Sequence, residues 1–94
     1  MTPPAPTESQ VADELEVFLR EQFPAMTSAR LGRDVDLFDT GVVDSVGVAE
    51  TLVHIEDRYG VEIPDEVLLS DDFTCIDGMA RSIVRLLADT AALP

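Results

Sequence analysis

Apolar residues recur in three stretches of this chain at the three- and four-residue spacing that places side chains on one face of an α-helix. The three apolar faces are, in order, Val11, Leu15, Phe18 and Leu19; then Val48, Leu52, Ile55 and Tyr59; then Ile76, Met79, Ala80, Ile83, Val84 and Leu87. We therefore expect three main helices that pack these faces against one another.

Turn-forming residues set the limits of these helices. The first begins at Glu8, and Pro24 cannot continue it because proline lacks the backbone N–H that a helix needs. The second runs from Ser45 to Tyr59, where Gly60 suits the left-handed position after a helix. The third begins between residues 74 and 77 and ends at about residue 90.

The connections between the helices differ in length. A long connection covers residues 24–44, with Leu31, Leu37 and Phe38 as its expected anchors and a turn at 32–34. After the second helix, residues 61–64 predict an extended loop with Val61 and Ile63 packed inward, followed by short helical turns at 64–69 and 70–73, the latter anchored by Phe73. The pattern predicts an all-α fold: a small bundle of three main helices plus one short helix, with a long first loop. We expect a disordered tail at 1–7, one domain at 8–90 and a frayed end at 91–94.

Composition narrows the class of protein. The 94 residues suffice for one small domain, 46% of them are hydrophobic, and the net charge of −13 includes no lysine. Such a chain repels nucleic acid and anionic membranes and attracts basic protein surfaces. The N-terminus lacks the positive region and the apolar run of a signal peptide, and no apolar run in the chain reaches the roughly 20 residues of a membrane helix. We expect a cytoplasmic, monomeric, free-standing protein.

Candidate chemistry is sparse. The lone Cys75 excludes an internal disulfide, and His54 has no catalytic partner at recognisable spacing, so we expect it at the surface. Aspartates at 34, 36 and 39 resemble a calcium loop, but the places for the required ligands and glycine hold Phe38, Asp39 and Ser45 instead. We expect neither a catalytic residue nor a dedicated metal site.

The segment before the second helix has more features than a connection needs. Leu37 and Phe38 are bulky residues in an acidic loop, Gly41 permits a turn with positive φ, and Asp44-Ser45 then opens the helix. A capping role is the simplest interpretation of an Asp-Ser pair, because both side chains accept bonds from free helical N–H groups. Gly47 costs helix stability and is expected to leave open space beside Ser45.

Taken with Glu50 and the later Gly60-Val61-Glu62-Ile63-Pro64, the run Leu37-Phe38-Asp39-x-Gly41-Val42-Val43-Asp44-Ser45 resembles an acyl carrier protein. The resemblance covers residues 8–88. It implies that Ser45 carries covalent 4′-phosphopantetheine, with Asp44 as its motif neighbour, and that the fold is the four-helix carrier bundle. Val46-Gly47 departs from the Leu-acid pair that fatty-acid carriers place after the serine. This is more similar to stand-alone carriers of D-alanyl ligation or of secondary metabolism, of polyketide or nonribosomal peptide type.

The resemblance also implies a set of partners and no enzymatic activity. A phosphopantetheinyl transferase attaches the group, an adenylating ligase or acyltransferase loads an acyl or aminoacyl thioester, and a downstream transferase or synthase receives it. The expected partner surface lies on a second face of the middle helix, comprising Val46, Ala49, Glu50, Val53 and Asp57. The alternative for Val46 and Val53 is membership of a wide core stripe. An unmodified helical adaptor and an acidic metal-responsive switch are the competing functions, and the cargo stays open.

Overall fold

The computed structural model describes residues 6–23, 32–39, 41 and 43–92, without the side chains of residues 45 and 90–92. Helix α1 spans Glu8–Gln22, α3 spans Ser45–Tyr59, the single turn α4 spans Asp65–Leu68, the 3-10 turn η1 spans Asp71–Thr74, and α5 spans Ile76–Ala92. Within these residues the structure is all-helical, which confirms the predicted fold class. No helix in the described part is long and apolar enough to span a membrane.

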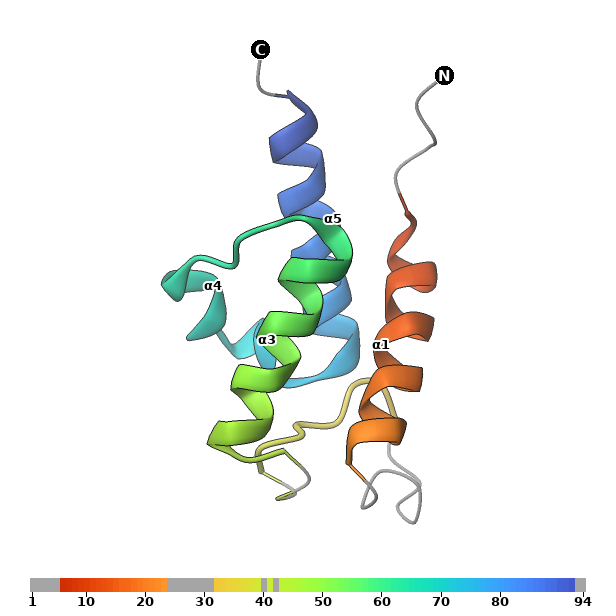
Figure 1. The fold of residues 1–94 in the computed structure, drawn as a ribbon, viewed down its shortest axis with the longest axis vertical. Coiled ribbons are helices and arrows are strands. Elements are labelled where there is room, and N and C mark those ends of the chain that lie inside the picture. The colour runs from red at the N-terminus through yellow and green to blue at the C-terminus, as the bar shows by residue number, and fades with distance from the viewer. Residues whose placement is uncertain (1–5, 24–31, 40, 42, 93–94) are drawn as a thin grey trace.

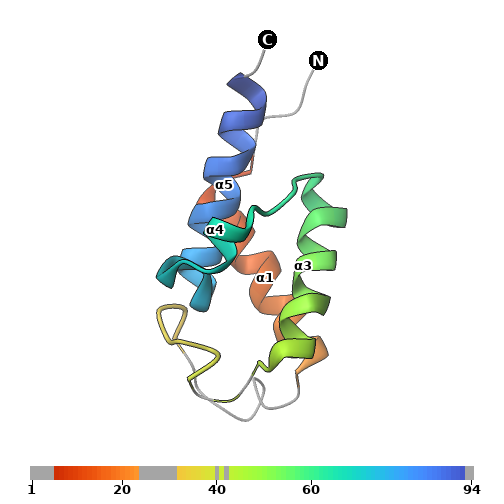
Figure 2. The same cartoon turned by 90° about the vertical axis from the view of Figure 1, so that its left-hand side faces the viewer.

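The three long helices form the bundle, with α1 running antiparallel to α3 and α5 (Figures 1 and 2). The last turn of α1 and the first turn of α3 therefore lie at the same end of the molecule. The short turn α4 lies on the side of α3 away from α1 (Figure 1). This arrangement leaves one flank of α3 and the adjoining flank of α1 on a common outer surface.

The core lies between the helices and takes residues from all of them except α4. Its buried apolar residues are Val11, Ala12, Leu15, Leu19, Leu37, Val43, Ile55, Val61, Ile63, Phe73, Ile76, Met79, Ala80 and Ile83. The first and third predicted faces are therefore largely correct. In α3 the buried line is Gly47, Thr51 and Ile55, whereas Val48, Leu52 and Tyr59 are half-buried. The apolar face predicted for α3 therefore lies to one side of the face that the structure buries.

Local sequence explains where the helices begin and end. Thr7 caps α1: its side chain accepts from the backbone N–H of Gln10 (3.1 Å), and the Gln10 side chain accepts in return from the Thr7 N–H (2.9 Å). Gly60 ends α3 with φ 68°, as predicted for a left-handed cap. At the start of α5 a Cβ on Gly78 would lie 1.6 Å from the backbone oxygen of Asp72, so glycine is what allows α5 to pack against η1.

The described parts of the connections match the prediction with a few corrections, whereas residues 24–31 of the long first connection lie outside the described residues. Leu37, Val61, Ile63 and Phe73 are buried anchors as expected, Phe38 is half-buried, and Cys75 is half-buried. Leu69, placed on the short helix by prediction, lies one residue beyond α4 and is 82% exposed. Leu31 and residues 1–5 lie outside the described residues. The domain limits of 8–90 stay a prediction, although α5 continues to residue 92.

Candidate functional site

The N-terminus of α3 is built around Asp44 rather than Ser45. Asp44 is the N-cap residue, with extended backbone (φ −101°), and its Oδ1 accepts from the backbone N–H of Gly47 at 2.8 Å. Ser45 is the first helical residue, and its side chain lies outside the described part of the structure. The capping interpretation of the Asp-Ser pair is therefore confirmed for Asp44, which holds the N-cap position.

The loop that leads to this helix is held on both sides of its turn. Leu37 is fully buried, and its carbonyl accepts from the N–H of buried Val43 at 3.2 Å. Gly41 has φ 74° and donates to the Phe38 carbonyl at 3.1 Å, which confirms the predicted turn. Residues 40 and 42 lie outside the described residues. Because both ends of the turn are anchored in the core, the backbone entering Asp44 has a fixed direction.

Gly47 has a packing role that the sequence did not show. A Cβ at this position would lie 2.6 Å from Phe23 Cε1 and 3.2 Å from Val43 Cγ1. The Phe23 ring, just after α1, therefore occupies the volume that a larger residue at 47 would take. The expectation that Gly47 leaves open space beside Ser45 is wrong, since that space holds the aromatic ring that joins α1 to the first turn of α3.

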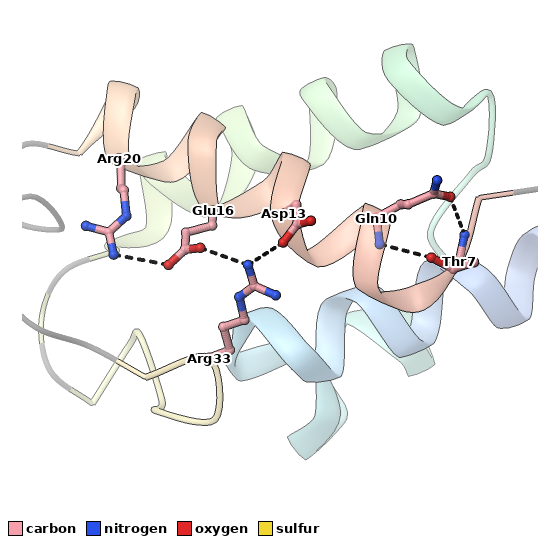
Figure 3. Close-up of polar contacts among 6 residues, drawn as sticks. All are labelled: Thr7, Gln10, Asp13, Glu16, Arg20 and Arg33. Atoms are coloured by element: carbon pink, nitrogen blue, oxygen red, sulfur yellow. Dashed lines mark hydrogen bonds and ion pairs between the residues drawn. The ribbon is translucent and has the colours of Figure 1, made fainter.

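Arg33 ties the same loop to two helices (Figure 3). Its Nη2 donates to Asp13 Oδ1 at 2.5 Å and to Glu16 Oε2 at 2.9 Å, both on α1, and its carbonyl accepts from the Asp77 N–H at the start of α5. Arg20 adds a second bond to Glu16 at 3.1 Å. These two guanidinium groups, that of Arg33 first, hold the pKa of the Glu16 carboxyl below its usual range. The role of Arg33 was not predicted from the sequence; the available signal was one of two arginines in a loop otherwise rich in aspartate.

The predicted partner surface is exposed. Val46 and Val53 are each 66% exposed, and Ala49, Glu50 and Asp57 are exposed beside them. The alternative of a wide core stripe is therefore wrong for both valines. These five residues, together called the α3 strip below, lie on the face of α3 opposite Gly47, Thr51 and Ile55. Their role in partner binding stays a prediction.

His54 is not the simple surface residue that the sequence predicted. It is half-buried, and its ring stacks on Phe18 of α1 with centroids 3.9 Å apart and planes 5° from parallel. Also between α1 and α3, Glu14 accepts hydrogen bonds from the Tyr59 hydroxyl and from Arg58 (2.7 Å). The Tyr59 bond, then the Arg58 bond, lowers the pKa of the Glu14 carboxyl, while burial raises the pKa of Tyr59. These contacts fix α1 against α3.

The described residues hold no group of three or more His, Cys, Asp or Glu side chains placed to bind a metal ion. What the site does offer is a helix N-terminus on an anchored loop, with a hydroxyl-bearing residue directly after the cap.

Comparison with known proteins gives one family and a set of relatives. Residues 18–83 match the family described as phosphopantetheine attachment site. The chain is 34% identical over 53 residues to the D-alanyl carrier protein of Streptococcus sanguinis (strain SK36), covering 56% of this chain and 67% of that protein. It is 33% identical over 54 residues to the D-alanyl carrier protein of Streptococcus suis (strain 05ZYH33), covering 57% and 68%.

Proposed function

The chain belongs to the phosphopantetheine attachment-site family, and from this premise we propose that Ser45 is the residue that holds the group. Members of this family are carriers rather than enzymes, and their cofactor is covalently attached 4′-phosphopantetheine. The resemblance found in the sequence is thus confirmed at the level of family, cofactor and non-catalytic function. The attachment residue, the cargo and the particular partners are proposals.

One observation carries the assignment of Ser45: Asp44, its neighbour in the motif, is the helix cap. The pair lies inside the matched span of 18–83, at the start of a helix and after an anchored loop. Because Asp44 satisfies the Gly47 N–H, the helix does not depend on Ser45 as its N-cap. Asp44 thus fixes the helix start, and the proposal leaves Ser45 as the residue that is modified.

The attachment reaction needs little from this chain. The Ser45 oxygen attacks the β-phosphorus of coenzyme A, a new O–P bond forms, and the pyrophosphate bond breaks to release adenosine 3′,5′-bisphosphate. The hydroxyl proton passes to a base of the transferase. When attached, the group supplies a terminal thiol that holds cargo as a thioester on a flexible arm, so that cargo meets successive active sites at high effective concentration. This chain's own task is to present Ser45 and to bind the enzymes.

We assign the cargo to the aminoacyl class. The support is the similarity to proteins named D-alanyl carrier proteins, which over half of this chain's length outweighs the resemblance to polyketide-type carriers. An aminoacyl cargo would be loaded by an adenylating ligase. It would then be used in a pathway of nonribosomal peptide type or of D-alanyl transfer. An acyl cargo loaded by an acyltransferase is the alternative that the loading assay below separates.

The α3 strip is the proposed surface for these partners. Val46 and Val53 offer apolar contacts, and Glu50 and Asp57 offer charges that attract basic enzymes. Exposed charges of this kind chiefly raise association rates, whereas central apolar contacts limit dissociation. A carrier must release each enzyme after transfer, so fast and weak association suits the function.

The function is tested by incubating the purified protein with coenzyme A and a broad-specificity phosphopantetheinyl transferase, then measuring intact mass. We expect one phosphopantetheine on the wild type and none on Ser45→Ala. The modified protein is then offered D-alanine and its adenylating ligase, or an acyl-coenzyme A and an acyltransferase, and scored for a thioester that hydroxylamine releases. An unmodified wild type, under conditions that convert a known carrier, contradicts the proposal.

A further inference from the structure

The outer surface of α3 continues across a pair of stacked rings onto α1. The ridge is the Phe18–His54 stack described above. An open depression of about 370 Å³, lined in part by Val17 and Glu21, lies on the α1 side of the ridge. A second depression of about 400 Å³, lined in part by Glu50 and Val53, lies on the α3 side. Both depressions include the two stacked rings in their walls, so they form one surface divided by a ridge.

Within the described part of the chain, large exposed apolar side chains gather on α1 and α3. Four large hydrophobic residues in the described part are more than half exposed, namely Val17 (58%), Val46 (66%), Val53 (66%) and Leu69 (82%). Three of the four lie on α1 and α3, and two of those line the depressions on either side of the ridge. A grouped apolar surface with a polar rim marks an interaction site, whereas a single exposed residue such as Leu69 does not.

The rim of this surface is negative. Glu21 and Glu50 are exposed carboxylates, one on each side of the ridge, and Asp57 lies further along α3. Arg58 is the cation on this rim, and it is already bonded to Glu14. A net charge of −13 opposes a second copy of this chain, a nucleic acid or an anionic membrane as the occupant. Charge complementarity leaves a basic protein segment.

We propose that α1 and α3 together form a docking face for a basic amphipathic helix of an enzyme that handles the cargo. Apolar side chains one turn apart on that helix straddle the Phe18–His54 ridge and contact Val17 and Val53, while its Arg or Lys side chains meet Glu21 and Glu50. This geometry follows the general mode in which an amphipathic helix lays its apolar face into a groove. The proposal rests on the proposed carrier function and adds the α1 half of the surface to the α3 strip.

The test is a titration of the isotope-labelled protein with a synthetic helical peptide, followed by backbone amide shifts. The probe carries two leucines four residues apart flanked by arginines, and a matched peptide replaces every arginine with glutamate. We expect the arginine peptide to shift the amides of Val17, Val53 and His54, and the glutamate peptide to shift none. Shifts confined to α4 and α5, or no binding of the arginine peptide, overturn the proposal.

Matched variants separate a specific face from general attraction between charges. Val17→Ser and Glu21→Lys should each weaken the peptide's affinity roughly five-fold, the size expected for losing a partly buried contact. The controls are Leu69→Ser and Glu66→Lys, which change an exposed apolar residue and an exposed carboxylate at or next to α4, on the other side of α3 from α1 (Figure 1). These control variants should weaken the peptide's affinity much less than Val17→Ser and Glu21→Lys do. Equal losses from test and control variants overturn the proposal.

Failure of the docking face and failure of the carrier assignment can be told apart. Attachment of phosphopantetheine to the wild type is measured by mass on the same preparation. A modified protein that does not distinguish the two peptides overturns only the docking face. A protein that binds the arginine peptide at this face but accepts no phosphopantetheine overturns the carrier function and leaves the surface as that of an adaptor.

Discussion

Replacement of Asp44 separates the structural role of this residue from its place in the attachment motif. Asp44→Ala removes the oxygen that accepts from the Gly47 N–H at 2.8 Å and leaves that donor without its cap. Loss of an N-cap costs about 1 kcal/mol, within a range of about 0.5–2. For a domain of this size that corresponds to a fall in Tm of roughly 4–8 °C. Urea unfolding should show a lower midpoint with an unchanged slope.

Two further variants test whether the stability lost in Asp44→Ala comes from the missing cap or from the missing charge. Asp44→Asn keeps an acceptor oxygen for the Gly47 N–H and removes the charge, so its stability should lie within a few tenths of a kcal/mol of the wild type. Thr7→Ala removes the cap of α1, whose Oγ1 accepts from the Gln10 N–H at 3.1 Å, at the far end of that helix from the attachment site. It should cost about the same stability as Asp44→Ala.

The same variants predict different rates of modification. Thr7→Ala should be modified by the transferase as fast as the wild type, because the start of α1 lies at the opposite end of the bundle from the start of α3 (Figure 1). Asp44→Ala should be modified more slowly. If Asp44→Asn loses as much stability as Asp44→Ala, or if Ser45→Ala loses more than either, the assignment of the cap to Asp44 is wrong.

Three other changes have defined outcomes. Gly78→Ala places a Cβ 1.6 Å from the Asp72 oxygen, so overpacking should outweigh the gain in helix propensity and lower the free energy of unfolding by about 2 kcal/mol or more; wild-type stability in a thermal melt would contradict this. The pKa values of the Glu14 and Glu16 carboxyls are lowered in the folded protein, so their contribution to the free energy of unfolding should be complete above the unfolded-state pKa near 4.5. That contribution should be lost as pH falls through the folded-state pKa values. A free energy of unfolding that stays constant across this pH range in the wild type would contradict this. Glu50→Lys should slow association with the transferase, most at low salt, with little change in dissociation, as stopped-flow kinetics can show.

Much of the bundle was predictable because its signals are local. The spacing of Val11, Leu15 and Leu19 gave the buried face of α1, and Gly60 gave the end of α3. The anchoring role of Leu37 followed from a bulky residue in an acidic loop. The capping box of Thr7 and Gln10 was also present in the sequence as a Thr-x-x-Gln signature and could have fixed the first residue of α1.

The orientation of α3 was harder to predict because several of its faces carry apolar residues. Val48 and Leu52 suggest one buried direction, and Val46 and Val53 suggest another. The structure buries neither fully, since the line through Gly47, Thr51 and Ile55 faces the core. A small residue and a hydroxyl do not stand out in a hydrophobic pattern. Thr51 is accommodated because its Oγ1 donates to the Gly47 carbonyl at 2.8 Å.

Contacts between distant parts of the chain could not be predicted from spacing at all. Arg33 meets Asp13 and Glu16 across 20 and 17 residues of sequence, and Phe18 meets His54 only once α1 lies against α3. The Asp44-Ser45 pair was recognisable from sequence as a capping pair, yet which of the two residues holds the N-cap position was not. Two good capping residues in succession give equal signals, and the backbone conformation decides that Asp44 takes the cap.

The most direct test of the account is to locate the phosphopantetheine by tandem mass spectrometry. The wild-type protein, after reaction with coenzyme A and the transferase, is digested, and the peptide that bears the group is fragmented. We expect one group per chain, on Ser45, with Ser45→Ala folded and unmodified. A group found instead on Ser9, Ser28, Ser70 or Ser82, or a Ser45→Ala protein that still gains one, would contradict it.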